Sequence, residues 1–438
     1  MKAEQLLDQI ERLDVYKRYG KVTRVVGLMI ESKGPDVSVG DVCYIVIGKR
    51  QQRKIGAEVV GFRDEYVLLM PFTNVSDISP GSLVEATGKP LHIKVGSSLI
   101  GSILNGLGDP LDGSEHPKGL FPFPTDNPPP NPLIRQPIRE PIEIGVRAID
   151  GLLTVGKGQR IGIFSGSGVG KSTLLGMMAR NSGADVNVIA LIGERGREVR
   201  AFIEKDIGKE GLQRSIIIAA TSDQPPLMRI KGALTATAIA EYFRDQGMNV
   251  MFMMDSVTRV AMAQREIGLA IGEPPTTKGY TPSVFSLLPK LLERSGTSAS
   301  GTITAFYTVL VDGDDLNEPI ADTVRGILDG HFVLERKLAG KGQFPAIDIL
   351  KSISRVMPDI VTKEHRQAAD RCRDLLATYS ESEDLIHIGA YKKGTSKKID
   401  EAIAAHDKII AYLKQDMDEK TSFQDAVNSL LTQFDKGE

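Results

Sequence analysis

Residues 161–173 read I-G-I-F-S-G-S-G-V-G-K-S-T. The apolar residues at the start of this stretch predict a short buried strand, and the run 174–180 that follows predicts a helix. Between them, Gly166, Gly168 and Gly170 permit positive φ, so successive backbone N–H groups can point into one concavity. A strand, a glycine-rich turn, Lys171 and a helix in this order are typical of a loop that binds phosphate groups.

The polar residues of this loop suggest contacts with ATP and Mg²⁺. Lys171 would reach the β- and γ-phosphates, and the Ser172 hydroxyl would ligate Mg²⁺. The strict pattern has Gly where this chain has Ser165, and the alternative is an ordinary glycine-rich turn with a solvated lysine. We favour a nucleotide site, formed by Ser165, Gly166, Ser167, Gly168, Val169, Gly170, Lys171, Ser172 and Thr173.

Length and composition narrow the class of protein. A chain of 438 residues is too long for one core, so two or three domains are expected. A net charge of −2 gives no general attraction to nucleic acid, and we expect no nucleic-acid partner. The two cysteines lack metal-ligand spacing, and the sequence shows neither a bilayer-length apolar run nor a signal-peptide core. We therefore expect a cytoplasmic protein.

The N-terminal part of the chain predicts a helix and then a barrel. In residues 1–20, apolar side chains at helical spacing predict an amphipathic helix, which packs on its own domain or docks a partner. In residues 20–89, the runs 22–26, 42–47, 58–62 and 66–69 are rich in β-branched residues and separated by turns. They predict a small β-barrel. Sparse aromatic and basic residues favour a structural barrel over a nucleic-acid-binding one.

The middle of the chain predicts an α/β domain. Eight prolines between positions 122 and 141 predict an extended stretch that is neither helix nor central strand and that wraps the next domain. Strands are expected at 186–192, 216–220, 250–254 and 302–309, with helices at 199–207 and 227–244. This alternation predicts a parallel sheet that is covered on both faces.

Two carboxylates follow apolar strands of this sheet, where ligands of parallel sheets bind. Asp255 ends the run V-M-F-M-M and is expected to hold Mg²⁺ opposite Ser172, although an Asp there could simply cap a helix. Glu194 follows I-A-L-I-G and is expected to polarise the attacking water. Arg259, four residues after Asp255, is expected to reach a phosphate. The alternative for Glu194 and its arginine-rich neighbours is a surface ion-pair cluster.

Three long runs of this sequence resemble one family. They are G-V-R-A-I-D-G-L-L-T-V-G-K-G-Q-R-I-G-I-F (145–164), G-E-R-G-R-E-V (193–199) and M-D-S-V-T-R-V-A-M-A-Q-R-E-I-G-L-A-I-G-E-P-P-T-T-K-G-Y-T-P-S-V-F (254–285). They resemble the type III export ATPases, which are relatives of the catalytic subunit of rotary ATP synthases, and most of all the flagellum-specific branch. The resemblance covers nearly the whole chain.

The resemblance implies an α/β fold with three parts. A RecA-like P-loop ATPase domain (90–360) would be preceded by the β-barrel (20–89) and followed by a helical C-terminal domain (361–438). The family works as a hexameric ring with nucleotide at each subunit interface. Lys171, Ser172, Asp255 and Glu194 fall on the family's phosphate, magnesium and catalytic-base positions. Arg355 falls on the arginine finger that enters the neighbouring subunit's site, and Phe344 on the ring that stacks against adenine.

The implied partners are those of an export apparatus. The loops 273–282 and 312–319 would face a coiled-coil central-stalk protein, with ordinary solvated loops as the alternative. A regulator would bind the N-terminal helix, export cargo and chaperones would be engaged, and the enzyme would lie at the inner-membrane export gate. The basic loop 389–398, between predicted C-terminal helices, is either a solvated surface or a contact with the membrane or gate.

Three other functions remain open at this point. An injectisome secretion ATPase shares the same motifs, and an RNA-translocating ring helicase also places a barrel before its RecA domain. A non-catalytic ring subunit is disfavoured because Glu194 is present.

Overall fold

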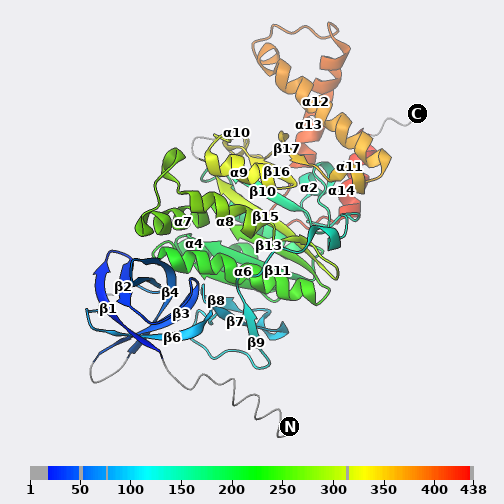
Figure 1. Ribbon diagram of the computed structural model, residues 1–438. Helices are drawn as coiled ribbons and strands as arrows, with labels where there is room; N and C mark the ends of the chain where they lie inside the picture. The colour runs from blue at the N-terminus through cyan, green and yellow to red at the C-terminus, as the bar shows by residue number, and fades with distance from the viewer. Residues whose placement is uncertain (1–17, 49–52, 75–76, 312–314, 435–438) are drawn as a thin grey trace.

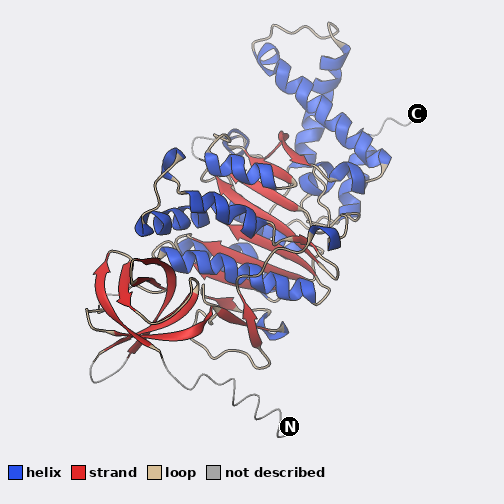
Figure 2. Cartoon of the chain, in the orientation of Figure 1, coloured by secondary structure: helices blue, strands red, loops and turns tan. Residues whose placement is uncertain are grey.

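The computed structural model describes residues 18–48, 53–74, 77–311 and 315–434. The expected N-terminal helix therefore lies almost wholly outside the described residues. The chain forms a barrel, a central sheet covered by helices, and a group of helices that projects from the far side of the sheet (Figures 1 and 2). The predicted α/β class, with a barrel before it and helices after it, is confirmed.

The barrel is closed by six antiparallel strands in the order β1-β2-β5-β4-β3-β6. Alternate side chains along these strands point inward and form a small apolar core around Ile45, Val59 and Leu69. Four of the strands were expected, and β2 and β6 are additional. Their bounds are β1 Tyr19–Val26, β2 Met29–Lys33, β3 Asp41–Ile47, β4 Arg53–Arg63, β5 Tyr66–Pro71 and β6 Leu83–Pro90.

The central sheet has the order β17-β16-β10-β15-β13-β11-β12-β8, and a short strand, β14, pairs with β15. All neighbours are parallel except the pairs β16–β17 and β14–β15. The bounds are β8 Ile103–Leu104, β10 Arg160–Ser165, β11 Val186–Ile192, β12 Ser215–Ala220, β13 Asn249–Asp255, β14 Gly296–Thr297, β15 Thr302–Leu310, β16 Gly330–Leu334 and β17 Ile347–Ser354. The four predicted strands of this region are confirmed.

Helices cover both faces of the sheet, because its strands are apolar on both sides. One face packs against α6 (Pro226–Asp245), α7 (Val257–Ile271), α8 (Pro282–Leu292) and α9 (Pro319–Ile327). The other packs against α2 (Arg147–Leu152), α3 (Lys171–Asn181) and α4 (Gly196–Ala201), which continues as a π-helical turn at Phe202–Ile207 and then α5 (Gly208–Leu212). Short α10 (Arg336–Gly340) and α11 (Met357–Ile360) flank β17.

The proline-rich stretch is extended and held against the sheet domain. Its start forms an edge strand, β9 (Phe121–Pro124), paired with β7 (His92–Val95), and one 3₁₀ turn occurs at Pro132–Ile134. Arg294, buried in an ion pair with Glu241, donates to the Thr125 carbonyl, and Asn127 donates to Glu241. The stretch therefore wraps the domain as expected, although the short turn departs from the prediction of no helix.

The C-terminal helices are α12 (Lys363–His387), α13 (Lys397–Leu413) and α14 (Phe423–Phe434). Their bases share one apolar core with α2 and β17, while the tip of the α12–α13 hairpin extends away from the sheet (Figure 1). Cys43 and Cys372 are both free and buried. Within the described ranges, no helix is both long enough and apolar enough to cross a bilayer.

Candidate nucleotide site

The glycine-rich loop leaves β10 at the carboxyl edge of the sheet and leads directly into α3. Strand β10 pairs with β15 on one side and with β16 on the other, and this pairing fixes the position from which the loop begins. Gly168 and Gly170 have φ values of 76° and 84°, a conformation that side chains with a Cβ rarely adopt. Gly170 precedes the first residue of α3, so the free N–H groups and the positive dipole end of this helix are available to an anion.

Lys171 lies between two carboxylates at the ends of neighbouring strands. Its Nζ contacts Oδ1 of Asp255, the last residue of β13, and is 3.7 Å from Oε1 of Glu194. The three side chains are 14%, 6% and 17% exposed, so water screens their charges weakly. Thr308 of β15 donates to Oδ1 of Asp255 at 2.7 Å and holds this carboxylate in place. The structure thus brings together three of the predicted site residues.

Glu194 has a strongly perturbed environment. Burial and the neighbouring charge of Asp255 raise its pKa to about 7, against the opposing effects of Lys171 and Arg259. Arg259 approaches the backbone before Glu194 closely, because a Cβ on Gly193 would lie 2.7 Å from that of Arg259. Gly193 also has a φ of 72°. A carboxylate whose pKa lies near neutrality suits a general base at neutral pH.

Two buried polar atoms at this site have no hydrogen-bond partner among the described residues: Oγ of Ser165 and Nε of Arg259. Buried polar groups in folded proteins are nearly always paired, so such atoms are suited to a polar ligand. The oxygen donors of Ser172 and Asp255 are of the kind that Mg²⁺ prefers. Ser172 is exposed in the first turn of α3 and free to take a ligand. The residues present therefore fit ATP with Mg²⁺.

Beside the loop is a cavity of about 320 Å³ that suits a planar base. The ring of Phe344 forms one wall, and a Cβ on Gly170 would lie 3.3 Å from it. The segment after α13 forms another part of the wall, and its Gln415 N–H donates to the Phe344 carbonyl at 2.9 Å. The lining consists of Gly170, Thr173, Leu174, Met177, Phe344, Pro345, Gln415, Asp416 and Met417.

Arg355 is not brought to this loop within the same chain. Strand β17 is antiparallel to its neighbour, and its last residue, Ser354, lies opposite Gly330 at the start of β16. Arg355 is therefore level with Arg160 at the start of β10, about 16 Å along the strands from Ser165, where the loop begins. Its side chain is exposed at the opposite edge of the sheet.

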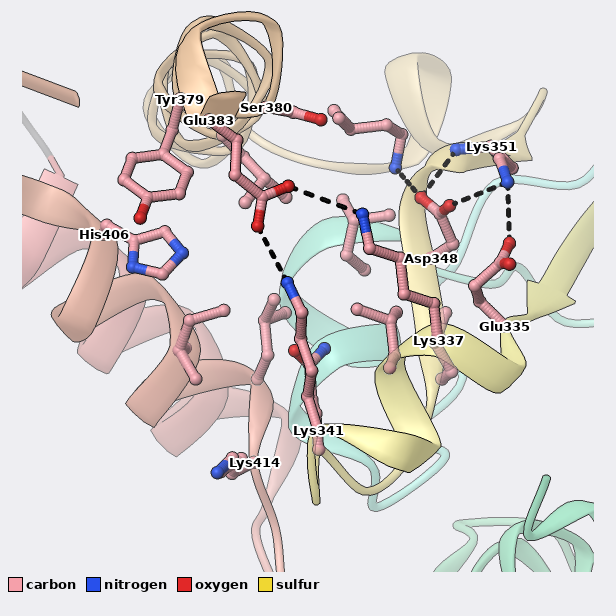
Figure 3. A pocket seen from close by; sticks show the side chains of 18 residues that line it. Glu335, Lys337, Lys341, Asp348, Lys351, Tyr379, Ser380, Glu383, His406 and Lys414 are labelled. Atoms are coloured by element: carbon pink, nitrogen blue, oxygen red, sulfur yellow. Dashed lines mark hydrogen bonds and ion pairs between the residues drawn. The ribbon is translucent and has the colours of Figure 1, made fainter. Parts of the chain in front are cut away.

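A separate cavity of about 340 Å³ lies between α10, β17 and the C-terminal hairpin (Figure 3). Ion pairs line it: Lys337 and Lys341 pair with Glu383 of α12, and Lys351 pairs with Glu335 and Asp348 on the β17 side. The rings of Tyr379 and His406 stack at 3.7 Å on its helical side. Its lining includes no residue of the glycine-rich loop and none of Lys171, Asp255 and Glu194, so this cavity is separate from the candidate nucleotide site.

Several site residues were not predicted from the sequence. Thr308 is a polar residue inside an apolar run, and its hydroxyl beside Asp255 depends on the pairing of two strands. Gln415, Asp416 and Met417 follow a helix with no motif around them, and only the docking of the C-terminal helices brings them to the base cavity. The only sign of these site residues in the sequence was Thr308 itself, a threonine within an apolar run.

Comparison with known proteins identifies the family. The model for the ATP synthase alpha/beta family, nucleotide-binding domain, matches residues 145–354, and the beta-barrel domain of that family matches residues 22–88. The T3SS EscN ATPase C-terminal domain matches residues 361–432. The predicted resemblance is therefore confirmed in each of the three parts of the chain.

The relatives cover the chain almost completely. The flagellum-specific ATP synthase of Bacillus subtilis (strain 168) is 66% identical over 98% of both chains. The type 3 secretion system ATPase of Xanthomonas euvesicatoria is 50% identical over 98% of this chain and 96% of the relative. The structure of the assembled ATPase EscN from the enteropathogenic E. coli type III secretion system has a TM-score of 0.89 at 47% identity, covering 94% of this chain and 99% of EscN. The chain belongs to the flagellum-specific and type III secretion ATPases of the ATP synthase alpha/beta family, enzymes that hydrolyse ATP to drive protein export.

Proposed function

We propose that this chain hydrolyses ATP in a Mg²⁺-dependent reaction at the interfaces of a homo-hexameric ring. The observation that carries the proposal is the separation within one chain. Lys171, Asp255 and Glu194 lie together, while Arg355 is exposed at the opposite edge of the sheet. A guanidinium there cannot serve its own site, but it can serve the site of an adjacent copy. The resemblance to the assembled ATPase EscN supports this arrangement.

Each side chain has a defined task in this proposal. The loop N–H groups and Lys171 bind the phosphates, while Ser172 and Asp255 would hold Mg²⁺, which neutralises charge on the β- and γ-phosphates when bound. Binding would draw Lys171 from its carboxylate partners toward the nucleotide. Glu194 accepts a proton from the attacking water, and Arg259 lies close enough to stabilise its charged form. Phe344 would stack on the base.

Arg355 would supply positive charge from the neighbouring subunit. An arginine finger contributes about 10³- to 10⁵-fold to phosphoryl transfer. A monomer, which lacks its neighbour's Arg355, should therefore turn over slowly.

The partners of the enzyme are also part of the proposal. EscN has been determined in complex with its central stalk EscO, and that structure has a TM-score of 0.87 with this chain. We place a coiled-coil stalk against the loops 273–282 and 312–319. Tyr280 donates to Glu318 at 3.2 Å, and Lys278 is 3.9 Å from Asp315, so the described parts of the two loops contact each other. They would act as one surface.

We further propose that the enzyme works at the cytoplasmic face of the inner membrane. A regulator would bind residues 1–20, and cargo–chaperone complexes and the export gate would be its other partners. The three domains would be 20–89, 90–360 and 361–438. The flagellar system is favoured over the injectisome because the relative named flagellum-specific is 66% identical, against 50% for the secretion ATPase.

The test is ATPase activity per subunit as a function of protein concentration. The intact chain should show a steep rise as rings form, whereas Arg355→Ala should remain about 10³-fold or more below it at every concentration. Sedimentation of the same samples reports assembly. A specific activity that stays constant from dilute monomer to assembled ring would contradict the proposal.

A further inference from the structure

The backbone that carries Arg355 is held by buried hydrogen bonds. The Arg355 N–H donates to the carbonyl of Asp329 at 3.1 Å. The fully buried side chain of Gln159 donates to the same carbonyl at 3.1 Å and to Oγ of Ser354 at 3.0 Å. Oγ of Ser354 in turn donates to the Thr154 carbonyl at 2.7 Å. These hydrogen bonds fix the backbone of Arg355 in the domain, although its side chain is exposed.

Asp329 is itself fixed from the side of β10. Arg160 binds its carboxylate with two parallel hydrogen bonds, from Nε at 3.0 Å and from Nη2 at 3.1 Å. Bidentate pairs of this kind are geometrically specific as well as strong. The turn between α9 and β16 is therefore rigid, and any side chain at the end of α9 has a defined position relative to Arg355.

Arg325 lies in the last turn of α9, next to Arg355. Nη2 of Arg355 is 3.5 Å from the Arg325 carbonyl oxygen. His331, which lies beside both residues, is neutral at pH 7, because burial and the positive charges of Arg325 and Arg355 lower its pKa. The Arg355 guanidinium therefore lies beside the backbone of Arg325, the charges of both arginines act on His331, and His331 adds no third charge.

The two arginines are poorly neutralised. Among the described residues, Arg325 forms an ion pair with Asp322 alone, at 2.8 Å; this aspartate lies one helical turn earlier and is 67% exposed. For Arg355, the described residues provide no carboxylate within ion-pair distance. The positive charges of Arg325 and Arg355 both act on His331, and one exposed ion pair offsets them only slightly. Such an arrangement suits a polyanion, which would bind both guanidinium groups.

We propose that Arg325 is a second guanidinium that acts across the subunit interface, binding the triphosphate of the nucleotide held by the adjacent chain alongside Arg355. This inference rests on the proposed function, in which Arg355 enters the neighbouring site. It adds a residue that no motif of the sequence indicated. Arg325 supplies a charge-assisted hydrogen bond to the phosphates, so its loss should lower turnover by about 10- to 100-fold.

The competing explanation is that Arg325 only stabilises its helix, through the dipole at the C-terminus of α9 and the pair with Asp322. Asp322→Asn separates the two explanations, because it breaks that pair and leaves the guanidinium in place. We expect Asp322→Asn to keep near-normal turnover. Arg366→Ala is the matched control, since Arg366 is also a helical arginine paired with an exposed aspartate, Asp370, in the same chain.

The decisive experiment mixes two full-length variants. Glu194→Gln chains lack the base but keep their arginines, and Arg325→Ala chains keep the base. If Arg325 acts across the interface, mixed rings contain complete sites in which the Gln variant supplies its arginines to the Ala variant. Turnover of the mixture should then exceed the mean of the two separate preparations, at concentrations where sedimentation shows assembly. Arg325→Lys keeps the positive charge and should retain most of the activity. If the Ala variant fails to assemble, the activity of Arg325→Lys tests the proposal in its place.

Arg355→Ala mixed with Glu194→Gln is run in parallel. Recovery with both arginine variants supports the proposal. Recovery with Arg355→Ala but not with Arg325→Ala overturns the role of Arg325 and leaves the proposed function intact. Failure of both mixtures overturns the trans arrangement itself, and normal turnover of Arg325→Ala alone overturns the inference directly.

Discussion

Glu194 lies between Asp255, which raises its pKa, and Lys171, which lowers it. Because these opposing effects leave its pKa at about 7, Glu194 can accept a proton and release it again within one catalytic cycle. Replacing it with Gln keeps the size and hydrogen bonding of the side chain but removes the basic oxygen. We expect Glu194→Gln to bind ATP as tightly as the intact chain and to lose about 10²- to 10⁴-fold in turnover. Calorimetry and a steady-state assay would measure the two quantities.

The control for this variant is Lys171→Ala, which should weaken nucleotide binding itself, because the lysine contacts the phosphates in the ground state. Near-normal turnover of Glu194→Gln would remove Glu194 from the role of base. Undiminished affinity of Lys171→Ala for ATP would count against the loop as the phosphate site.

The pH dependence of activity follows from the same carboxylate. With a pKa of about 7, Glu194 is half protonated near neutrality and cannot accept a proton when it is already protonated. Since kcat/KM reports the free enzyme, it should fall about tenfold for each unit of pH below about 7 and level off above it. The profile should be recorded with assembly monitored throughout. A kcat/KM that does not change between about pH 6 and pH 8 would exclude this titration.

At the scale of single elements, His365 ties the start of α12 to α2. Its Nε2 lies 2.7 Å from the Gly151 carbonyl, which can only accept, so the ring donates from Nε2. Burial lowers its pKa below the ordinary value. The unfolded chain therefore binds the proton first as the pH falls. The contribution of His365 to stability is complete above about pH 6.5 and is lost as the pH falls through that range toward the lower folded pKa.

His365→Gln keeps an N–H donor but cannot titrate in this range. We expect its melting temperature to fall less between about pH 7.5 and about pH 5.5 than that of the intact chain. The lowered pKa of His331 acts in the same direction, so the reduction should be partial, and His331→Gln is the comparison. Circular dichroism follows the transition. If the melting temperature of His365→Gln falls between the two pH values by as much as that of the intact chain, His365 does not cause the pH dependence of stability.

The elements also show what the sequence could and could not predict. Strand β11 and Asp255 at the end of β13 were predictable because continuous apolar runs and the residues that end them are local features. Strands β2 and β6 were missed because each is short or partly exposed and gains its stability from pairing around the barrel. Thr308 and Gln415 could not be assigned, since their roles depend on contacts between segments far apart in the chain.

At the scale of the whole molecule, the nucleotide site and the C-terminal helices share a wall. Gln415 is buried, and its side chain accepts from the Arg147 N–H and donates to the carbonyls of Gly145 and Glu419. The backbone N–H of Gln415 donates to the carbonyl of Phe344, so the segment after α13 is fixed against the base cavity. A base in that cavity would contact both parts of the molecule. Nucleotide binding should therefore stabilise the docking of the C-terminal helices on the sheet.

Hydrogen exchange measures this coupling directly. With a non-hydrolysable ATP analogue at saturation, we expect slower exchange in the segment from Gln415 to α14, by about 10-fold or more, because a ligand that binds only the docked state suppresses local opening. Lys171→Ala at the same analogue concentration should show little slowing, since it weakens binding without touching the C-terminal helices. The tip of the α12–α13 hairpin, remote from the cavity, is the internal reference (Figure 1). Slowing confined to the P-loop and α3 would mean that nucleotide leaves the docking of the C-terminal helices unchanged.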